Sequence, residues 1–347
     1  MNSKIIVITP VKNEDWILKQ FLKATSQFAD VILVADQNST DQSREICREF
    51  KKVILISNED VFFNEANRQK LLISKARELF PDCNRILFGL DADEIITFDS
   101  LKKSNLWQEI RQYEKGTTLY FEKPDILPGI AECVRWRRNY FPIGYIDDGI
   151  EHSPKEIHSR RVPSNPNGKA IYVDEVKFMH FAISRNKVQS AKTRYYSVIE
   201  NIKSTKPAYL RRYMYKSYFD PRREYPKENF ETIRKDWIEG WKNNDVNLYN
   251  LFEPEYSWQD VEVLKIFSIY GCDKFHWDNI WDFDWDNLLG KVRYENHLSN
   301  LNIVRPTILK KFAALFIDLM YRCYIHLRSI RSRLVILLNK IRRIHEM

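Results

Sequence analysis

Three carboxylates end a short apolar segment of this 347-residue chain. Residues 85–90 read RILFGL, and Asp91, Ala92, Asp93 and Glu94 follow directly. A buried strand that ends in this way delivers Asp91 and Asp93 to the carboxyl edge of a sheet, where open α/β sheets bind ligands. Carboxylates held so close repel each other unless a cation joins them, and hard divalent ions prefer carboxylate oxygen. The Asp-x-Asp pattern therefore predicts a divalent metal site, although an acidic turn after a strand is a common alternative.

The elements that position these acids are readable from the hydrophobic pattern of the first hundred residues. Short apolar segments alternate with segments whose large apolar residues recur at helical spacing or that begin with helix-capping residues. The expected strands cover 4–9, 31–35, 53–57 and 86–90, and the expected helices cover 15–29, 41–50 and 64–79. This alternation predicts an α/β fold with a mostly parallel sheet and right-handed crossovers. No G-x-G-x-x-G follows a strand, which counts against a dinucleotide-binding Rossmann unit.

Three motifs at successive strand ends carry a family resemblance. They read VITPVKNEDWIL from residue 7, VILVADQNSTDQS from residue 31 and RILFGLDADE from residue 85. In this order they resemble the start of a family 2 glycosyltransferase with the GT-A nucleotide-sugar-binding fold. The resemblance covers residues 1 to about 100 well and continues more loosely to about 200. The family usually has two acids after the second strand, and Gln37 replaces the second one here. Glutamine still hydrogen-bonds a base edge but carries no charge.

The resemblance implies roles for individual residues. The nucleotide sugar is expected to contact Thr9, Pro10, Glu14, Asp36, Arg68, Asp91 and Ala92. A divalent ion, Mn²⁺ or Mg²⁺, is expected on Asp91, Asp93 and His180. His180 closes an expected strand, KFMHF, and imidazole beside carboxylate is more usual for manganese than for magnesium. The alternative for His180 is a core histidine whose ring nitrogens are satisfied locally.

A polar segment after residue 140 holds the candidates for a general base. It contains Asp147, Asp148, Glu151, His152 and His158. Direct displacement of a nucleotide diphosphate inverts the anomeric carbon and needs a carboxylate near the acceptor hydroxyl. Asp148 and Glu151 are the two candidates, and the sequence does not decide between them. The alternative is a polar loop whose acids pair with the arginines at 135, 137 and 138.

The C-terminal segment 305–347 is basic and amphipathic. It holds ten Lys and Arg against Asp318 and Glu346, an excess of +8 that equals the formal charge of the whole chain. Its apolar residues recur at helical spacing, but no run reaches the roughly 18 uncharged apolar residues of a membrane span. Such a helix suits the surface of an anionic membrane. The alternative is a pair of helices that pack on the catalytic domain or on another copy.

The rest of the chain indicates the domain boundaries and the cellular compartment. We expect a GT-A catalytic domain over 1–204, a mainly helical acceptor-side region over 205–304 and the basic tail over 305–347. Six of the nine tryptophans fall in 205–304, either to stack on sugars or to fill a core. Five scattered cysteines without a C-x-x-C pair indicate a reducing compartment. The expected strand at residue 4 leaves no room for a signal peptide, which favours a cytoplasmic protein, peripheral at the inner face of the membrane.

These observations lead to one expected function and two alternatives. We expect an inverting glycosyltransferase that moves a sugar from a uridine diphosphate donor to a saccharide or lipid-linked acceptor. Nucleic acid is not an expected partner, because the sheet domain offers no basic reading surface. A sugar-phosphate nucleotidyltransferase would normally show a glycine-rich basic signature near the first strand, and TPVKNEDWIL has none. A non-catalytic GT-A scaffold tethered at the membrane is the second alternative.

Overall fold

The computed structural model describes residues 3–60, 64–135, 140–155, 159–203, 206–249 and 251–345. It divides into two compact units. The first comprises Met1–Arg185 with Pro221–Phe252, and the second comprises Asn186–Asp220 with Glu253–Met347. These units differ from the predicted segments that ended at 204 and 304. The long helix α6 (Asn186–Lys203) packs on α10 (Trp258–Tyr270), so it belongs with the C-terminal helices although it follows the sheet domain in sequence.

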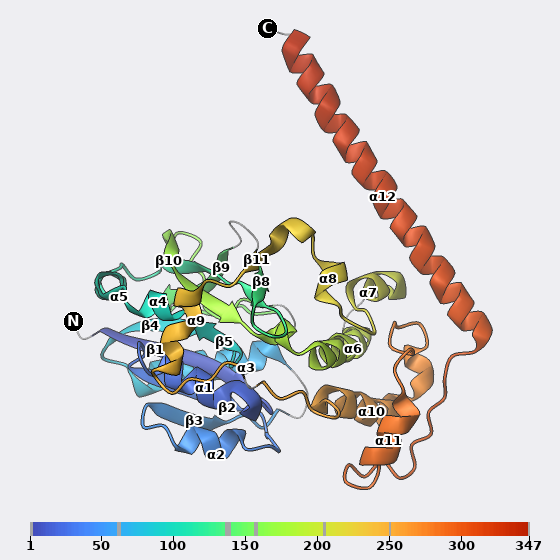
Figure 1. Cartoon of the computed structure of the whole chain (residues 1–347), viewed down its shortest axis with the longest axis horizontal. Coiled ribbons are helices and arrows are strands. Elements are labelled where there is room, and N and C mark those ends of the chain that lie inside the picture. The colour runs from blue at the N-terminus through green and yellow to red at the C-terminus, as the bar shows by residue number, and fades with distance from the viewer. Residues whose placement is uncertain are drawn as a thin grey trace. The chain divides into compact units, whose positions relative to one another are not determined.

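The first unit begins with a parallel sheet whose strand order is β3-β2-β1-β4. The strands are β1 (Ser3–Val11), β2 (Val31–Asp36), β3 (Val53–Ser57) and β4 (Asn84–Gly89). The helices between them are α1 (Asp15–Thr25), α2 (Ser43–Arg48) and α3 (Glu65–Leu79). Figure 1 draws this part in blue to cyan. Strands and helices lie where the hydrophobic pattern predicts them.

The central strand β1 is buried on both faces, which explains its continuous apolar sequence. Because successive side chains of a strand point to opposite faces, Ile5 and Val7 join the cluster that includes α1, whereas Ile6 and Ile8 join the cluster that includes α3. All four are at most 2% exposed. This double burial fixes the register of β1, and with it the position of the residues that follow the strand.

Beyond β4 the sheet becomes mixed. Strand β9 (Tyr140–Ile146) runs antiparallel to both β4 and β6 (Thr118–Glu122), and β6 is parallel to β10 (Ala170–His180). Shorter strands extend this half: β5 (Glu94–Ile96), β7 (Asp125–Ile126), β8 (Glu132–Val134) and β11 (Phe230–Thr232). The helices α4 (Phe98–Leu101), α5 (Ser104–Ile110), α8 (Pro221–Glu224) and α9 (Lys235–Lys242) complete the unit. The predicted α/β class with a helical C-terminal region is confirmed.

The second unit is helical around an aromatic core. Besides α6 and α10 it contains α7 (Ala208–Met214), α11 (Trp285–Val292) and α12 (Ile308–His345). Phe267 and Trp281 stack with ring centroids 5.5 Å apart, and Trp285 is fully buried beside them. In the first unit Trp237 and Trp241 are buried as well. These four tryptophans fill cores, which is the second of the two alternatives that the sequence left open.

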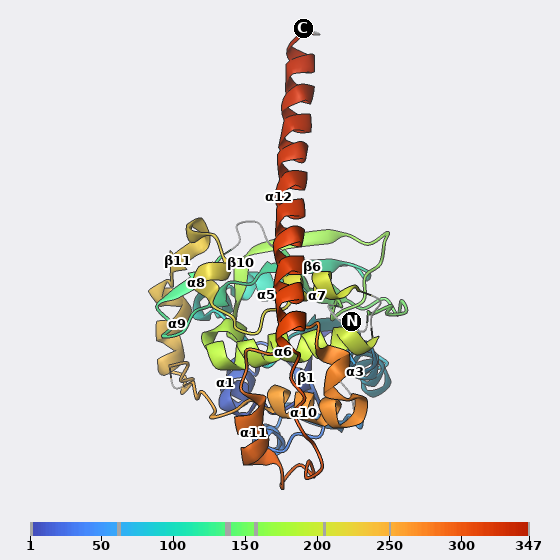
Figure 2. The same ribbon diagram turned by 90° about the vertical axis from the view of Figure 1, so that its right-hand side faces the viewer.

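Helix α12 is one unbroken helix in Figures 1 and 2. One of its faces packs within the second unit. Asp318 accepts two hydrogen bonds of 2.7 Å from Arg212, Tyr321 contacts the rings of two α7 tyrosines, and Ala314 is buried. Among the helices that the structure describes, none is long and apolar enough to cross a membrane.

Candidate active site

The Asp-x-Asp turn lies where β4 ends, at the carboxyl edge of the parallel strands. Its backbone is tight, because the amide of Glu94 donates to the carbonyl of Asp91 (3.0 Å) and the amide of Asp91 donates to Glu94 Oε2 (3.2 Å). Glu94 opens β5 and is fully buried, as is Ala92 to within 1%. The turn therefore holds one acid inside the protein and presents Asp91 and Asp93 outward.

Two cations neutralise the buried acid. Glu94 lies 2.6 Å from Arg161 Nη1 and 2.8 Å from Lys123 Nζ, and the other guanidinium nitrogen of Arg161 lies 2.5 Å from Asp91 Oδ2. Burial alone would raise the pKa of Glu94, but Arg161 and Lys123 outweigh burial and hold that pKa well below its usual range. Asp91 is thus occupied by a guanidinium within the protein.

Asp93 and His180 come together on the other side of the turn. Strand β10 pairs with β5 so that His180 is opposite Glu94, and the amide of Phe181 donates to the carbonyl of Asp93 (2.8 Å). His180 Nε2 lies 3.8 Å from Asp93 Oδ2, while Nδ1 lies 2.5 Å from Asp125 Oδ1. A carboxylate on one ring nitrogen that leaves the other facing outward is typical of metal-binding histidines.

The predicted three-residue metal set does not assemble. In the part of the chain that the structure describes, no three His, Cys, Asp or Glu side chains form a group that could hold an ion. Asp91 is turned toward Arg161, which leaves Asp93 and His180 as a pair. Two protein ligands fit a cation whose remaining positions are filled by substrate phosphates and water, which is the usual state of Mg²⁺ on phosphate substrates. The residues present therefore fit a divalent ion, with two ligands in place of three.

Unsatisfied polar atoms mark the ends of β1 and β2. Thr9 Oγ1 and Asp36 Oδ1 are buried and have no hydrogen-bond partner among the described residues. Asp36 lies beside Val11 in the register, and Pro10 lies beside Ala35, so these residues share one edge. The second oxygen of Asp36 lies 3.3 Å from Arg44. Because buried polar atoms are nearly always satisfied, the two orphan oxygens indicate a place for ligand donors.

The other predicted nucleotide contacts lie at the starts of helices. Glu14 precedes α1, its side chain accepts a hydrogen bond from Trp16 (2.6 Å), and its amide donates to Ser43 (2.9 Å). Arg68 is in the first turn of α3, which begins at the same edge because it crosses over between parallel strands. Gln37 is buried and donates to the carbonyl of Asp60 (2.9 Å). Its amide nitrogen is thus engaged within the protein.

The structure does not bring Asp148 to this edge. The amide of Asp147 donates to the carbonyl of Arg85 near the start of β4 (2.9 Å), whereas Asp91 follows the end of that strand. Arg85 and Asp91 are six residues apart along an extended strand, which corresponds to roughly 20 Å. Burial would raise the pKa of Asp148, but hydrogen bonds, chiefly from Tyr145 (2.6 Å), lower it. The position of Asp148, near the start of β4, therefore counts against the expectation that it is the general base.

Glu151 lies beside the middle of α3. The carbonyl before it accepts a hydrogen bond from Arg77 (2.8 Å), and His152 after it lies 2.9 Å from Gln69. Its side chain is exposed and is not brought to Asp93 either. Asp147 does pair with arginines, but with Arg77 and Arg85, not with Arg135 of the alternative. The remaining parts of that alternative, residues 137 and 138, and His158 lie outside the described residues.

Residues 147–155 and 159–165, here called the strap, run along α3 and return. The amide of Ser159 donates to Glu65 at the start of α3 (2.9 Å), two residues before Arg161 reaches the Asp-x-Asp turn. Asn165 then contacts Asp148 at the far edge again (2.7 Å). Arg161 is thereby the contribution of the strap to the site. Sequence reasoning missed Arg161, Lys123 and Asp125, because none belongs to a motif.

Comparisons with known proteins bear on the family of the sheet domain. Residues 6–121 match the family model described as Glycosyl transferase family 2. No curated protein sequence matches the chain. Similar solved structures include glucosyl-3-phosphoglycerate synthase from Mycobacterium tuberculosis in complex with Mn²⁺, UDP and glucosyl-3-phosphoglycerate, at 19% identity and a TM-score of 0.25. That match covers 36% of this chain and 44% of the mycobacterial one.

Two further solved structures show how far the likeness extends. One is 4-diphosphocytidyl-2C-methyl-D-erythritol synthase, with 13% identity and a TM-score of 0.30; the match covers 42% of this chain and 76% of the synthase. The other is a glycosyltransferase involved in the glycosylation of the major capsid of PBCV-1, with 13% identity and a TM-score of 0.27; the match covers 51% of this chain and 93% of that glycosyltransferase. These likenesses are too weak to carry an assignment. The family match and the α/β fold carry it for one part of the chain, because residues 6–121 match glycosyltransferase family 2 and lie in a sheet domain consistent with the GT-A fold.

Proposed function

We propose that this protein is an inverting glycosyltransferase that uses a divalent cation and a uridine diphosphate sugar. The observation that carries the proposal is the chain of contacts from Asp125 through His180 to Asp93 at the carboxyl edge of the sheet. Next along that edge lie the unsatisfied oxygens of Thr9 and Asp36. A pair of metal ligands beside buried polar atoms without partners suits a diphosphate joined to a nucleoside.

Each group at the edge has a distinct task in this proposal. Asp93 and His180 hold the cation, which when bound neutralises charge on the diphosphate as it leaves. The carboxylate of Asp36 accepts a hydrogen bond from the nucleoside, and the hydroxyl of Thr9 donates or accepts one. Arg161 contacts Asp91 and Glu94 with its two terminal nitrogens and so holds the turn that carries Asp93. A metal ligand that is fixed in place before the substrate arrives needs little reorganisation during the reaction.

The transfer itself is a single displacement. The acceptor oxygen forms a bond to the anomeric carbon, and the bond from that carbon to the diphosphate oxygen breaks with its electron pair on the diphosphate. The hydroxyl proton passes to a carboxylate near the acceptor. The acids at this edge already have other partners, since Asp91 pairs with Arg161 and Asp125 with His180. We therefore assign the proton acceptor to neither of them, and we leave Asp148 and Glu151 out of the step.

The direct test is donor turnover by the full chain. Uridine diphosphate glucose, galactose and N-acetylglucosamine are each incubated with the protein in MnCl₂ or in excess chelator, and release of uridine diphosphate is measured. We expect manganese-dependent release of uridine diphosphate from at least one donor. Guanosine diphosphate mannose is assayed in the same way to test whether the enzyme requires uracil as the nucleobase. Donor binding without turnover under every condition would favour the scaffold alternative and overturn the proposal.

Removing the carboxylate behind His180 should weaken the metal site without deleting a ligand. Asp125→Ala should lower the apparent manganese affinity by about 10- to 100-fold, the usual effect of losing the hydrogen-bonded partner of a metal ligand. Asp125→Asn, which keeps an acceptor without its charge, should lie between. The readout is the manganese concentration for half-maximal donor hydrolysis, with the exposed Asp82→Asn as control. An unchanged manganese dependence in Asp125→Ala would remove His180 from the metal site.

We further propose that α12 binds the surface of an anionic membrane, where a lipid-linked acceptor is presented. Leu309, Phe312, Phe316 and Leu319 are 58–80% exposed. At about 100° per residue they lie roughly 140–220° around the helix from the buried Ala314, opposite the face that packs on α7. The intramolecular packing alternative thus accounts for one face only. The basic residues of the tail favour anionic lipid over a second copy of an equally basic helix.

Charges on the exposed face of α12 should release the protein from membranes. Phe312→Glu with Phe316→Glu should reduce cosedimentation with vesicles of phosphatidylcholine containing phosphatidylglycerol by at least about tenfold, because it removes apolar burial and adds repulsion. Wild type should bind pure phosphatidylcholine weakly. The matched control is Tyr294→Glu, which changes an aromatic side chain that is 82% exposed outside the helix. Equal cosedimentation of variant and wild type would favour packing or oligomerisation by the tail.

A further inference from the structure

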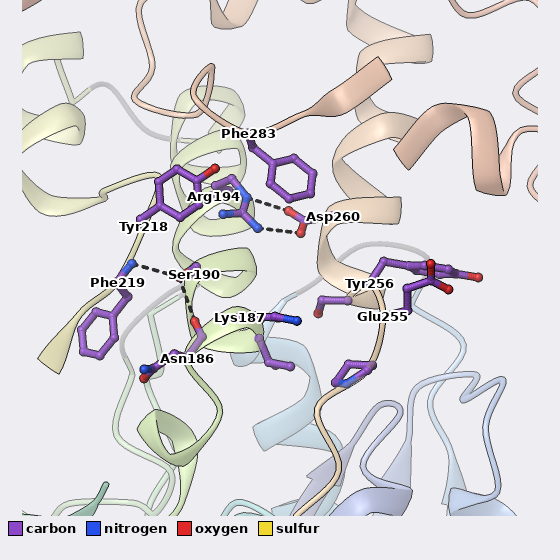
Figure 3. A pocket seen from close by; sticks show the side chains of 13 residues that line it. Asn186, Lys187, Ser190, Arg194, Tyr218, Phe219, Glu255, Tyr256, Asp260 and Phe283 are labelled. Atoms are coloured by element: carbon purple, nitrogen blue, oxygen red, sulfur yellow. Dashed lines mark hydrogen bonds and ion pairs between the residues drawn. The ribbon is translucent and has the colours of Figure 1, made fainter. Parts of the chain in front are cut away.

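A cavity lies inside the second unit, and the proposed transfer does not use it. Its volume is about 240 Å³. The lining comes from the start of α6, from residues 218–219, from residues 254–260 and from Phe283 (Figure 3). The volume is just below the roughly 300–1,000 Å³ of sites for drug-sized ligands. The cavity therefore suits a ligand about as large as a sugar ring.

The walls of this cavity are aromatic. Tyr218 and Phe283 stand on either side of Arg194 in Figure 3, with their ring centroids 5.9 Å and 4.0 Å from its guanidinium carbon. Phe219 and Tyr256 line other parts of the cavity. Val188 and Pro254 are the aliphatic members of the lining. Flat rings beside polar groups suit the C–H face of a sugar, whereas a lipid chain would call for aliphatic walls.

The charges of the lining cancel. Arg194 donates to both oxygens of Asp260 (2.8 and 2.7 Å), and each side chain is 3% exposed. Lys187 and Glu255 provide one further charge of each sign. Two cations against two carboxylates give no net attraction for a diphosphate or an anionic headgroup. The same oxygens and ammonium groups supply hydrogen bonds to hydroxyls, since a carboxylate oxygen keeps spare acceptor capacity.

Hydrogen bonds behind the walls hold them in place. Tyr218 donates through its hydroxyl to the carbonyl of Asp282 (3.1 Å), and Arg194 Nη1 donates to the carbonyl of Ser217 (2.5 Å). The amide of Phe219 donates to Ser190 Oγ (2.9 Å), which itself donates to a carbonyl of α6. A site with fixed walls loses little entropy when it binds a ligand.

We propose that this cavity binds a neutral sugar unit of the acceptor saccharide. The proposal rests on the proposed transferase function, and it names the substrate class and the residues that recognise it. Tyr218 stacks on the ring, the Arg194–Asp260 pair and Ser190 hydrogen-bond its hydroxyls, and Lys187 and Glu255 act at the rim, while Phe283 packs against the guanidinium of Arg194 and holds it in place.

The test measures sugar binding by the full chain. A mixture of methyl glucoside, methyl galactoside, methyl mannoside, methyl N-acetylglucosaminide, lactose and maltose is observed by saturation-transfer NMR. At least one sugar should receive saturation from the wild type, and Tyr218→Ala should lower its affinity by about tenfold through the lost stacking. Tyr294→Ala is the matched control, because it removes an exposed tyrosine of the same unit. Lys187→Met, at an exposed position, gives a second variant should Tyr218→Ala fail to fold.

Donor hydrolysis separates this proposal from the transferase proposal. Tyr218→Ala and Lys187→Met should both keep manganese-dependent donor hydrolysis. In assays with a transferable acceptor, they should raise the KM for the acceptor more than they change kcat. Sugar binding that is lost in the variants supports the cavity even if no donor is hydrolysed. If wild type binds none of the sugars, or if the variants bind them as well as wild type does, the cavity proposal is overturned while donor turnover still stands.

Discussion

Asp93→Asn should lower manganese-dependent donor turnover by about 100- to 1,000-fold, the equivalent of losing several kcal/mol of charge stabilisation at the leaving diphosphate. Asp93 is 13% exposed, and the side-chain contact that the structure gives it is the one to His180 at 3.8 Å. Loss of its charge therefore weakens a proposed metal ligand and breaks no structural ion pair of the kind that holds Asp91. Donor hydrolysis at saturating manganese is the measurement.

The control for this experiment must separate chemistry from folding. Asp82→Asn is matched in size and charge change, and Asp82 is exposed before β4, at the end of that strand away from the turn. It should keep full turnover, and both variants should unfold at the temperature of the wild type. Direct titration of Mn²⁺ by electron paramagnetic resonance gives a readout that does not depend on the donor. Full turnover in Asp93→Asn would remove the cation from the proposed mechanism.

The sequence predicts the parallel half of the fold because that information is local. Residues 5–8 are apolar without interruption, and the structure buries every one of them between two helical layers. The Asp-x-Asp turn then follows from the end of one such strand. His180 was placed by family resemblance, and the β5–β10 pairing brings it to Asp93. Where an apolar segment forms a parallel strand as predicted, the residues that follow it lie at the carboxyl edge of the sheet.

The error over the general base has one physical cause. A mostly parallel sheet would carry the residues after β9 to the same edge as Asp91. Strand β9 is antiparallel to β4, however, with Ile146 opposite Ile86, so the acids after it arrive at the opposite edge. An apolar strand has the same pattern in both directions. The sequence therefore locates the acids along the chain and leaves open the end of the sheet at which they lie.

Residues that reach the site through long excursions leave no such signal. Arg161 lies 70 positions from Asp91, within a strap whose composition is that of an ordinary polar loop. Its role depends on the contact between Ser159 and Glu65, which no periodicity encodes. Asp125 is likewise defined by its distance to His180 and by no motif. Tertiary contacts select these side chains, and spacing alone cannot.

Arg161→Met should destabilise the first unit by about 3–5 kcal/mol, because it leaves a buried carboxylate with one of its two cations. Glu94 is fully buried, and Lys123 alone would then face it. The lowered pKa of Glu94 means that its ion pairs add stability above the unfolded pKa of about 4.5, and that this stability is lost as the pH falls toward the folded pKa. Urea unfolding at pH 7 and at pH 4 should show a smaller difference between variant and wild type at the lower pH.

A double-mutant cycle distinguishes this explanation from a simple loss of packing. Glu94→Gln removes the buried charge, so Arg161→Met with Glu94→Gln should be more stable than the sum of the two single changes implies. Arg161→Lys should recover part of the stability, since one ammonium can pair with Glu94 but cannot span Glu94 and Asp91 as two guanidinium nitrogens do. If the two changes add without coupling, the charge of Glu94 is not what Arg161 compensates. Arg161 would then be a packing residue of the strap, and its ion pairs would not be what holds the Asp-x-Asp turn.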